Sequence, residues 1–295
     1  MQRVEQEIAR LIKEIDYDEV THLFSMLSGG KRLRAKLILK IASSDDRAPL
    51  LAAIVELIHG ASLLHDDVID ESHTRRGVAS VNATEGSKTA VMLGDILYSK
   101  AFSELVSFDR DIAKVVSSSV TALSKGEMQD VKLAQIFNSD EDKYLDMLYL
   151  KTATLIEASA IAAALLVGKD IQTYGLYGRN LGLSFQIIDD ILDITSDAVT
   201  LGKPSMNDYV EGKCTLPYIY LYQALDDADK QRLVFSHAKS IDTDEALWIK
   251  EKMEEHQSIE RAFKLAHELS HEAMEAVSDD HALVSILDTM IKRSY

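Results

Sequence analysis

The sequence contains a single cysteine, Cys214, among 295 residues. One cysteine excludes a disulfide within the chain and a zinc site built from cysteine thiolates, and it is typical of a reducing compartment. Prolines are also scarce, with three in the whole chain, and no stretch rich in proline or serine marks a linker. We therefore expect one continuous domain over residues 1–295 in a soluble, cytoplasmic protein.

Basic residues are too few to balance the acidic ones. Lysine and arginine number 32 against 48 aspartates and glutamates, which gives a net charge of −16. Such an acidic chain argues against nucleic acid as a partner and against a basic membrane-binding face. Long apolar runs are missing too, because the longest, residues 158–168, is interrupted by Ser159 and is too short to span a bilayer. Residues 1–12 do not resemble a signal or transit peptide, so we expect no transmembrane segment.

The alternating pattern of β-strands is absent as well. Apolar residues instead recur at steps of three and four, which predicts helices over residues 51–70, 90–106, 111–133, 142–166 and 174–195. Amphipathic helical stretches continue from residue 218 to the end. The predicted loops are 43–49, 74–86 and 197–213, which carry glycine, asparagine, serine and basic residues. The expected fold class is all-α.

Against this background, the pattern Asp-Asp-x-x-Asp occurs twice in apolar surroundings. Because residues four apart share a helix face, the first and last aspartates of each pentad form a carboxylate cluster. Like charges at this spacing repel, and Mg²⁺ is the cation usually held by one or two carboxylates together with water and phosphate oxygens. Two solvated acidic patches are the alternative, although the apolar flanks favour buried helices. The candidate metal ligands are Asp66, Asp67, Asp70, Asp189, Asp190 and Asp193.

The basic residues are grouped in places where they could meet phosphate oxygens. Residues 28–34 put two glycines before a basic run at a predicted helix start, where backbone N–H groups and cationic side chains can face one anion. A plain turn is the alternative there. Lysines act as point charges and arginines as bidentate clamps on phosphate, so the whole set indicates a site for two diphosphates. The other groups are Arg75-Arg76-Gly77, for which a structural role is the alternative, Lys151-Thr152, Gly202-Lys203 and Gly212-Lys213.

The order of these motifs resembles the trans-polyprenyl diphosphate synthase family, and most closely its bacterial long-chain octaprenyl members. The resemblance implies the isoprenoid synthase fold, a single large helical bundle around a deep central cavity, and a homodimer. It implies isopentenyl diphosphate and an allylic prenyl diphosphate as substrates. The motifs span residues 28–220 and read Gly-Gly-Lys-Arg-Leu-Arg, Ile-His-x-Ala-Ser-Leu-Leu-His-Asp-Asp-x-x-Asp, Arg-Arg-Gly, Gly-Asp-x-Leu-Tyr, Lys-Thr-Ala, Phe-Gln-x-x-Asp-Asp-x-x-Asp, Gly-Lys and Glu-Gly-Lys-x-Thr-Leu-Pro.

The resemblance also implies roles for individual residues. The pentads would hold several Mg²⁺ ions on the allylic diphosphate, and the groups acting in catalysis would be Asp66, Asp70, Asp189, Lys151 and Lys203. Isopentenyl diphosphate would be bound by Lys31, Arg34, His59 and Arg76. The allylic substrate would be bound by Arg75, Lys151, Thr152, Gln186, Lys203 and Lys213. A hydrogen-bonded core histidine is the alternative for His59, and it stays open for His65. This chain departs from the family at Ala35, where a proline is usual, and at Asn207, beside Asp208.

The implied reaction is ionisation of the allylic C–O bond, attack on the cation by the double bond of isopentenyl diphosphate, and loss of a proton. The small residues Ala61 and Ser62 lie about one turn before Asp66, where an aromatic residue would block a growing chain. By resemblance, we therefore predict a long-chain product, octaprenyl, used in quinone biosynthesis and partitioning into membranes. The alternatives are a geranylgeranyl or farnesyl synthase, a noncatalytic prenyl-diphosphate-binding subunit of a heteromeric synthase, and a Ca²⁺-binding helical bundle, which would need looped ligands that this sequence lacks.

Overall fold

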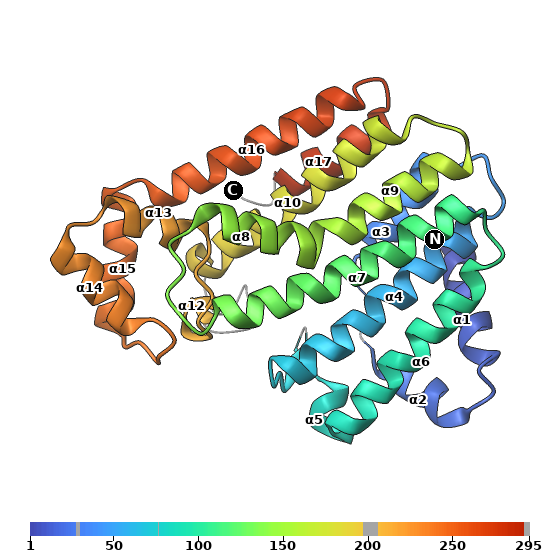
Figure 1. The fold of residues 1–295 in the computed structure, drawn as a ribbon, viewed down its shortest axis with the longest axis horizontal. Helices are drawn as coiled ribbons and strands as arrows, with labels where there is room; N and C mark the ends of the chain where they lie inside the picture. The colour runs from blue at the N-terminus through green and yellow to red at the C-terminus, as the bar shows by residue number, and fades with distance from the viewer. Residues whose placement is uncertain (28–29, 76, 197–205, 292–295) are drawn as a thin grey trace. The chain divides into compact units, whose positions relative to one another are not determined.

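The structure is a computed structural model that describes residues 1–27, 30–75, 77–196 and 206–291. Its described part is helical apart from one two-stranded ribbon (Figure 1), which confirms the all-α prediction. The elements are α1 (Gln2–Lys13), α2 (Asp18–Met26), α3 (Leu33–Ile41), α4 (Ala48–Ile69), β1 (Thr74–Arg75), β2 (Val78–Ala79), α5 (Val81–Glu85), α6 (Ser87–Leu105), α7 (Arg110–Leu133), α8 (Glu141–Leu148), the π-helical turn η1 (Tyr149–Ala153), α9 (Thr154–Leu166), α10 (Ile171–Thr195), α12 (Asn207–Val210), α13 (Leu216–Ala224), α14 (Asp227–Ser236), α15 (Thr243–Glu255), α16 (Ser258–Ala276) and α17 (His281–Ile291).

The chain forms two compact units. Unit 1 contains residues Met1–Val120 and Leu155–Gly175, and unit 2 contains Thr121–Thr154 and Leu176–Tyr295. Helices α7 and α10 each contribute residues to both units, so neither unit is one uninterrupted stretch of chain. The expectation of a single domain over residues 1–295 stays a prediction.

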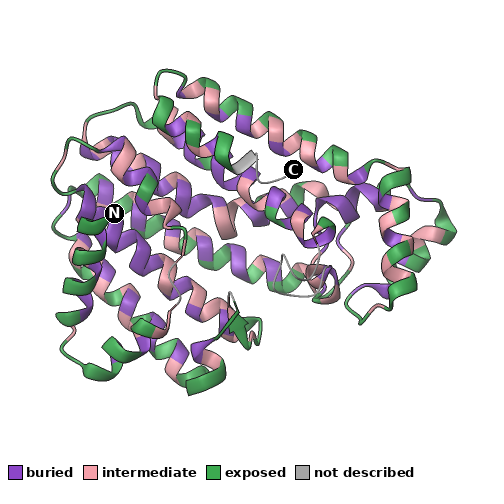
Figure 2. Ribbon diagram, turned by 180° about the vertical axis from the view of Figure 1, so that it is seen from behind, coloured by how far each residue is buried: buried purple, intermediate pink, exposed green. Residues whose placement is uncertain are grey.

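Helix α4 is the central helix of unit 1. It contacts α1, α3, α5 and α6. Pro49 lies in its first turn, where the fixed φ of proline favours helix initiation. Residues 51–58 are all buried, so this stretch of the helix is covered on every side and is drawn in purple in Figure 2. This burial fixes α4 and places the first acidic pentad at its C-terminal end.

Two helical stretches are long and apolar enough to cross a membrane by length and composition. They are α4 and the continuous stretch Glu141–Leu166, and 72% and 61% of their apolar windows are buried inside the protein. Burial of this extent is typical of core helices, which satisfy the same criteria as membrane spans. The sequence predicted a helix over most of each stretch, but only residues 158–168 were considered as a possible membrane span.

A small ribbon and a short helix occupy the predicted loop 74–86. Strands β1 and β2 pair antiparallel, with Thr74 opposite Ala79, and Gly77 lies in the turn with φ of +76°. Glycine adopts this conformation without steric cost, as tight hairpin turns require. Ser80 then caps α5 by accepting a hydrogen bond from the Ala83 N–H at 3.1 Å. Strands of two residues are too short to show alternation, which is why the sequence predicted only a loop.

Unit 2 is built around α13, which contacts α8, α15 and α16. Its core includes Tyr209 and Tyr218, which stack with ring centroids 4.4 Å apart. The predicted helix over residues 142–166 is interrupted by η1, a single π-helical turn. A π turn inserts an extra residue into the helical repeat and is frequent at functional sites. The side chains of Lys151 and Thr152 lie within this turn.

Candidate functional site

The first pentad lies at the C-terminal end of α4. The helix ends at Ile69 and Asp70 is its C-cap, so all three carboxylates lie in its last turn. The helix dipole is negative at this end, which adds to the repulsion among the carboxylates. Asp66 is half-buried and Asp70 is exposed, whereas Asp67 is buried. The arrangement therefore favours a cation near Asp66 and Asp70.

Asp67 differs from the other two aspartates because arginine holds it. Nε of Arg75 donates to Oδ1 of Asp67 at 2.8 Å, and Nη2 lies 2.7 Å from the same oxygen. Asn82 donates to the backbone carbonyl of Asp67 at 3.1 Å. The ribbon β1–β2 and helix α5 are thus attached to the end of α4. Arg75, predicted to bind the allylic diphosphate, is paired with a pentad carboxylate in this structure.

His65, directly before the pentad, packs onto α6. Its Nε2 lies 3.2 Å from the Val91 carbonyl oxygen and 3.5 Å from Oδ1 of Asp95. A Cβ at Gly94 would lie 2.3 Å from Nε2 of His65, so the glycine makes room for the ring. The Tyr98 ring lies beside it at 5.5 Å. These contacts place the Gly-Asp-x-Leu-Tyr motif against His65 and give this histidine a packing role.

Glu56, a buried residue of α4, organises the basic segment that precedes α3. Its Oε2 accepts a hydrogen bond from Nη1 of Arg32 at 3.1 Å, and its Oε1 accepts one from the Ala35 N–H at 3.1 Å. A proline at position 35 could not donate this second bond. Arg34 has a buried Nε with no hydrogen-bond partner among the described residues, and burial lowers the pKa of its guanidinium to about 10 despite the charge of Glu56. Lys31 lies exposed at the same segment.

We expect Glu56→Gln to lower the free energy of unfolding by about 2 kcal/mol, because it removes the charged partner of Arg32 in a desolvated place. Glu5→Gln is the matched control. Glu5 also binds Arg32, at 3.0 Å, but its side chain is 51% exposed against 4% for Glu56. Its loss should cost less than about 1 kcal/mol. Urea denaturation followed by circular dichroism measures both, and equal losses would contradict this account.

The two residues predicted to limit product length are both buried in α4. Ala61 is fully buried, and the Ser62 hydroxyl donates to the His59 carbonyl at 2.9 Å. The hydroxyl is thus satisfied within the helix, and neither residue carries a bulky side chain. His59 is half-buried one turn earlier.

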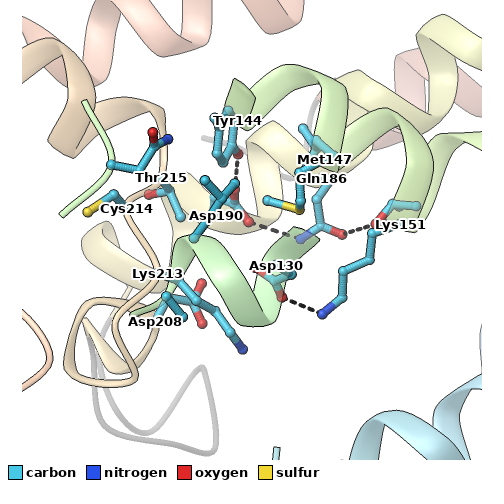
Figure 3. Close-up of a pocket in the computed structure, with 15 residues that line it drawn as sticks. Asp130, Tyr144, Met147, Lys151, Gln186, Asp190, Asp208, Lys213, Cys214 and Thr215 are labelled. Carbon is cyan, nitrogen blue, oxygen red and sulfur yellow. Dashed lines mark hydrogen bonds and ion pairs between the residues drawn. The ribbon is translucent and has the colours of Figure 1, made fainter. Parts of the chain in front are cut away.

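Unit 2 contains a pocket of about 130 Å³ beside the second pentad (Figure 3). Its polar lining residues come from α7 and the segment after it, from α8 and η1, from α10, and from α12 and the segment after it. Of the residues predicted from the sequence, Lys151, Thr152, Gln186, Asp190 and Lys213 line it. The remaining lining residues are Asp130, Leu133, Ala134, Asn138, Tyr144, Met147, Leu148, Asp208, Cys214 and Thr215.

Asp190 is the buried member of the second pentad. The Tyr144 hydroxyl donates to its Oδ2, and Nε2 of Gln186 donates to its Oδ1 at 2.9 Å. Burial, followed by the negative charge of Asp208, raises the pKa of Asp190 well above its ordinary value. Oε1 of Gln186 in turn accepts a hydrogen bond from the Thr152 hydroxyl at 3.4 Å. A chain of hydrogen bonds therefore runs from η1 to the pentad.

The other two aspartates of this pentad lie in different surroundings. Oδ2 of Asp193 accepts the backbone N–H of Asp208 at 3.1 Å, and the Asp193 carbonyl accepts that of Met206 at 2.7 Å. Asp193 is thus buried against the start of α12. Asp189 is exposed. The pentad lies near the end of α10 at Thr195, so its carboxylates also face the negative end of a helix dipole.

Lys151 is held by two carboxylates of α7 that the sequence analysis did not single out. Its Nζ lies 2.9 Å from Oε2 of Glu127 and 2.5 Å from Oδ2 of Asp130 (Figure 3 shows the second pair). Gly126 allows η1 to approach α7, because a Cβ there would lie 2.3 Å from the Lys151 backbone nitrogen. The spacing of three between Glu127 and Asp130 on one helix face is the signal in the sequence that could have suggested a shared cation.

A family model decides the identity of this chain. The model described as Polyprenyl synthetase matches residues 17–269. The chain belongs to the polyprenyl synthetase family. It is an enzyme, a prenyl transferase of the trans-prenyl diphosphate synthase type, with isoprenoid diphosphates as substrates and the all-α isoprenoid synthase fold.

Relatives of this polyprenyl synthetase include enzymes with different product lengths. It is 33% identical to octaprenyl diphosphate synthase of Haemophilus influenzae, over 100% of this chain and 94% of that protein. It is 32% identical to geranylgeranyl diphosphate synthase of Sulfolobus acidocaldarius, over 89% and 83% of the two chains. The crystal structure of octaprenyl pyrophosphate synthase from Helicobacter pylori is 43% identical and superposes with a TM-score of 0.94, covering 98% of this chain and 97% of that one.

The structure places the predicted residues of the synthetase in two groups. Unit 1 carries Lys31, Arg34, His59, Arg75 and the first pentad, and unit 2 carries Lys151, Thr152, Gln186, Lys213 and the second pentad. Arg76 and Lys203 lie outside the described residues. The residues that sequence reasoning missed are Glu56, Glu127, Asp130 and Tyr144. Their importance comes from contacts with residues 21 to 46 positions away in the chain.

The pentads fit magnesium by the chemistry of their donors. Within the described residues, no group of three or more histidine, cysteine, aspartate or glutamate side chains is arranged as a metal site. Each pentad nevertheless offers hard oxygen ligands at the negative end of a helix. Mg²⁺ characteristically binds through one or two carboxylates and keeps other positions for water and substrate phosphate. Asp66, Asp70 and Asp189 are the most exposed donors and fit this use best.

Proposed function

We propose that this polyprenyl synthetase is a Mg²⁺-dependent enzyme that condenses isopentenyl diphosphate with an allylic diphosphate in successive head-to-tail steps. The product is a long-chain all-trans polyprenyl diphosphate, octaprenyl diphosphate. The observation that carries the proposal is the pocket in unit 2, where Lys151, Thr152, Gln186, Asp190 and Lys213 meet around one anion-sized cavity. Lysines, amides and a metal-binding carboxylate beside one cavity suit a diphosphate.

The proposed site assigns each substrate a set of side chains. The six pentad aspartates hold Mg²⁺ with the allylic diphosphate. The cationic and polar residues that bind this diphosphate are Arg75, Lys151, Thr152, Gln186, Lys203 and Lys213. Isopentenyl diphosphate is bound by Lys31, Arg34, His59 and Arg76. Bound Mg²⁺ supplies neutralisation of the charge that develops on the departing diphosphate.

The protein's own residues contribute binding, orientation and exclusion of water. The allylic C–O bond breaks and its electron pair leaves with the diphosphate, whose oxygens Lys151 and Lys213 contact. The double bond of isopentenyl diphosphate then forms the new C–C bond, and the proton lost in restoring an allylic double bond passes to the released diphosphate. Gln186 orients Asp190 through its 2.9 Å hydrogen bond. Apolar helix faces shield the allylic cation from water.

Product length follows from the small residues of α4. Ala61 and Ser62 leave no bulky side chain one turn before the pentad, and the chain is similar to two octaprenyl synthases at 33% and 43% identity. The geranylgeranyl synthase among the relatives supports a shorter product as the second candidate. On the resemblance to the bacterial family, we further propose a cytoplasmic homodimer that supplies a quinone side chain.

We expect Ala61→Phe and Ser62→Phe each to shorten the main product by at least one isoprene unit, because the new ring enters the path of the growing chain. Ala52→Phe is the matched control on the same helix, since it makes the same change at a buried position on the face of α4 opposite Ala61. Chromatography of the dephosphorylated products measures the change. Unchanged product length in both test variants would contradict the assignment.

The function itself is tested by incubating the purified protein with farnesyl diphosphate, labelled isopentenyl diphosphate and Mg²⁺. We expect a ladder of products that ends at octaprenyl and disappears when the metal is chelated. A ladder ending at geranylgeranyl would keep the activity and replace the proposed product. Binding of prenyl diphosphate without any turnover would instead indicate the noncatalytic subunit of a heteromeric synthase.

A further inference from the structure

Each described cation on the proposed allylic side is already paired with a carboxylate of the chain itself. Arg75 binds Asp67, Lys213 binds Glu211 at 2.9 Å, and Lys151 binds both Glu127 and Asp130. A diphosphate that binds these residues therefore has to displace protein carboxylates from them. This competition is strongest at Lys151, where two carboxylates bind one ammonium group.

The carboxylates of Glu127 and Asp130 together form a clamp on Lys151, and this clamp is built into the fold of unit 2. Glu127 and Asp130 lie one turn apart on α7, and both are more than nine-tenths buried, at 6% and 7% exposure. Neither carboxylate oxygen of Glu127 has a hydrogen-bond partner among the described residues, so its ion pair with Lys151 is the compensation that the structure gives it. Gly126, the residue before it, sets the close approach of η1.

The clamp contains one more acidic group than basic groups. Two buried carboxylates face one lysine, and buried charges are screened by solvent less than exposed ones. When a diphosphate binds Lys151, the carboxylates of Glu127 and Asp130 lose their ion pairs with this lysine. Leaving buried carboxylates without a cationic partner is unfavourable. Asp130 also lines the pocket and repels an anion within it. The clamp must therefore weaken the binding of any diphosphate in this pocket.

We propose that Glu127 lowers the affinity of the pocket for diphosphate and thereby promotes release of the inorganic diphosphate formed in each condensation. Glu127 competes for Lys151, and the exchange between carboxylate and phosphate oxygens keeps the leaving group from remaining on the enzyme. A chain-elongating enzyme forms inorganic diphosphate at every step, so its release recurs throughout one product's synthesis. This inference rests on the proposed function and identifies Glu127 as a residue that regulates product release.

The test is the affinity of the purified full-length protein for inorganic diphosphate, measured by isothermal titration calorimetry with Mg²⁺ and again with the metal chelated. Glu127→Gln keeps the shape of the side chain and removes its charge. We expect the variant to bind inorganic diphosphate about tenfold more tightly under both conditions, as removal of a nearby buried charge predicts. Inhibition of the condensation by added inorganic diphosphate should strengthen by the same factor.

A gain of affinity separates this role from a merely structural one, because a damaged pocket would bind the anion more weakly. Asp130→Asn removes the other carboxylate and should change the affinity in the same direction. Asp146→Asn is the matched control, since it removes one charge from an exposed residue of α8 that binds Gln129 at 3.0 Å. It should leave the affinity unchanged within about twofold.

The outcomes distinguish this inference from the function on which it rests. Unchanged or weaker binding in Glu127→Gln, with a wild-type protein that binds inorganic diphosphate and elongates prenyl chains, would overturn the role of Glu127 alone. A wild-type protein that neither binds inorganic diphosphate nor elongates prenyl chains would overturn both. Tighter binding in Glu127→Gln and Asp130→Asn, but not in Asp146→Asn, would support it.

Discussion

Replacing Asp66 by asparagine should lower kcat by about 10²–10³-fold, the loss typical of removing one group that stabilises developing charge. Asp66 shares a helix face with Asp70 at the negative end of α4, and it is accessible enough to bind a metal. Asparagine has nearly the same shape but no charge. The loss should appear in kcat and in a raised Mg²⁺ requirement, both measured with farnesyl diphosphate and isopentenyl diphosphate as substrates.

Glu71→Gln provides the control for Asp66→Asn. Glu71 is an exposed acid directly after the pentad, with φ of +50°, and glutamine preserves its size. The same change of charge beyond the end of α4 should alter kcat by less than about threefold, since exposed charges are well screened. If Asp66→Asn kept kcat and the Mg²⁺ requirement within the range of this control, the first pentad would have no part in metal binding.

Replacing Gly126 by alanine should have the second large effect. The added Cβ would lie 2.3 Å from the backbone nitrogen of Lys151, and backbone cannot rotate away as a side chain can. The π turn η1 would have to move from α7, which we expect to cost about 1–3 kcal/mol of stability. Because a displacement of about 1 Å in a positioned group can cost 10²-fold in rate, kcat/KM should fall by about that factor. Thermal unfolding and steady-state kinetics measure the two effects.

Gly175→Ala tests whether the effect of Gly126→Ala is local. Gly175 is also helical, but the atoms nearest to its Cβ would belong to the Ile161 side chain, at 3.3 Å, which can adjust. Alanine also favours helix by about 1 kcal/mol over glycine. We therefore expect near-normal stability and activity. Equal losses in both variants would mean that helix packing in general, rather than the position of Lys151, explains the result.

Much of the fold was predictable because helices depend on local spacing. Apolar residues at steps of three and four gave the long helices α4, α6, α7 and α10 to within a few residues at most ends. The sequence missed η1, because one inserted residue in a helix hardly changes that spacing. It also missed the ribbon β1–β2, whose two-residue strands are too short to alternate.

The identity and spacing of most candidate site residues were also predictable, because they too depend on residues close together in the sequence. The two acidic pentads and the basic segments are short motifs, so their residue types and spacing are complete in the sequence. The burial and the interaction partners of each side chain were not predictable. Asp67 and Asp190 each directly follow a more exposed aspartate, Asp66 or Asp189, in their pentads. Arg75 nevertheless holds Asp67, and Tyr144 and Gln186 hold Asp190.

The sequence by itself determined the all-α fold class and a family that acts on isoprenoid diphosphates, because both depend on patterns within a few consecutive turns of helix. Only the tertiary structure decided which carboxylates are buried and which cations are already paired. Lys151 lies 21 positions from Asp130 and 24 from Glu127, and Asp190 lies 46 from Tyr144. Such pairs form when the folded chain brings separate helices together. Burial then strengthens the interaction between their polar and charged groups, because solvent screens it less.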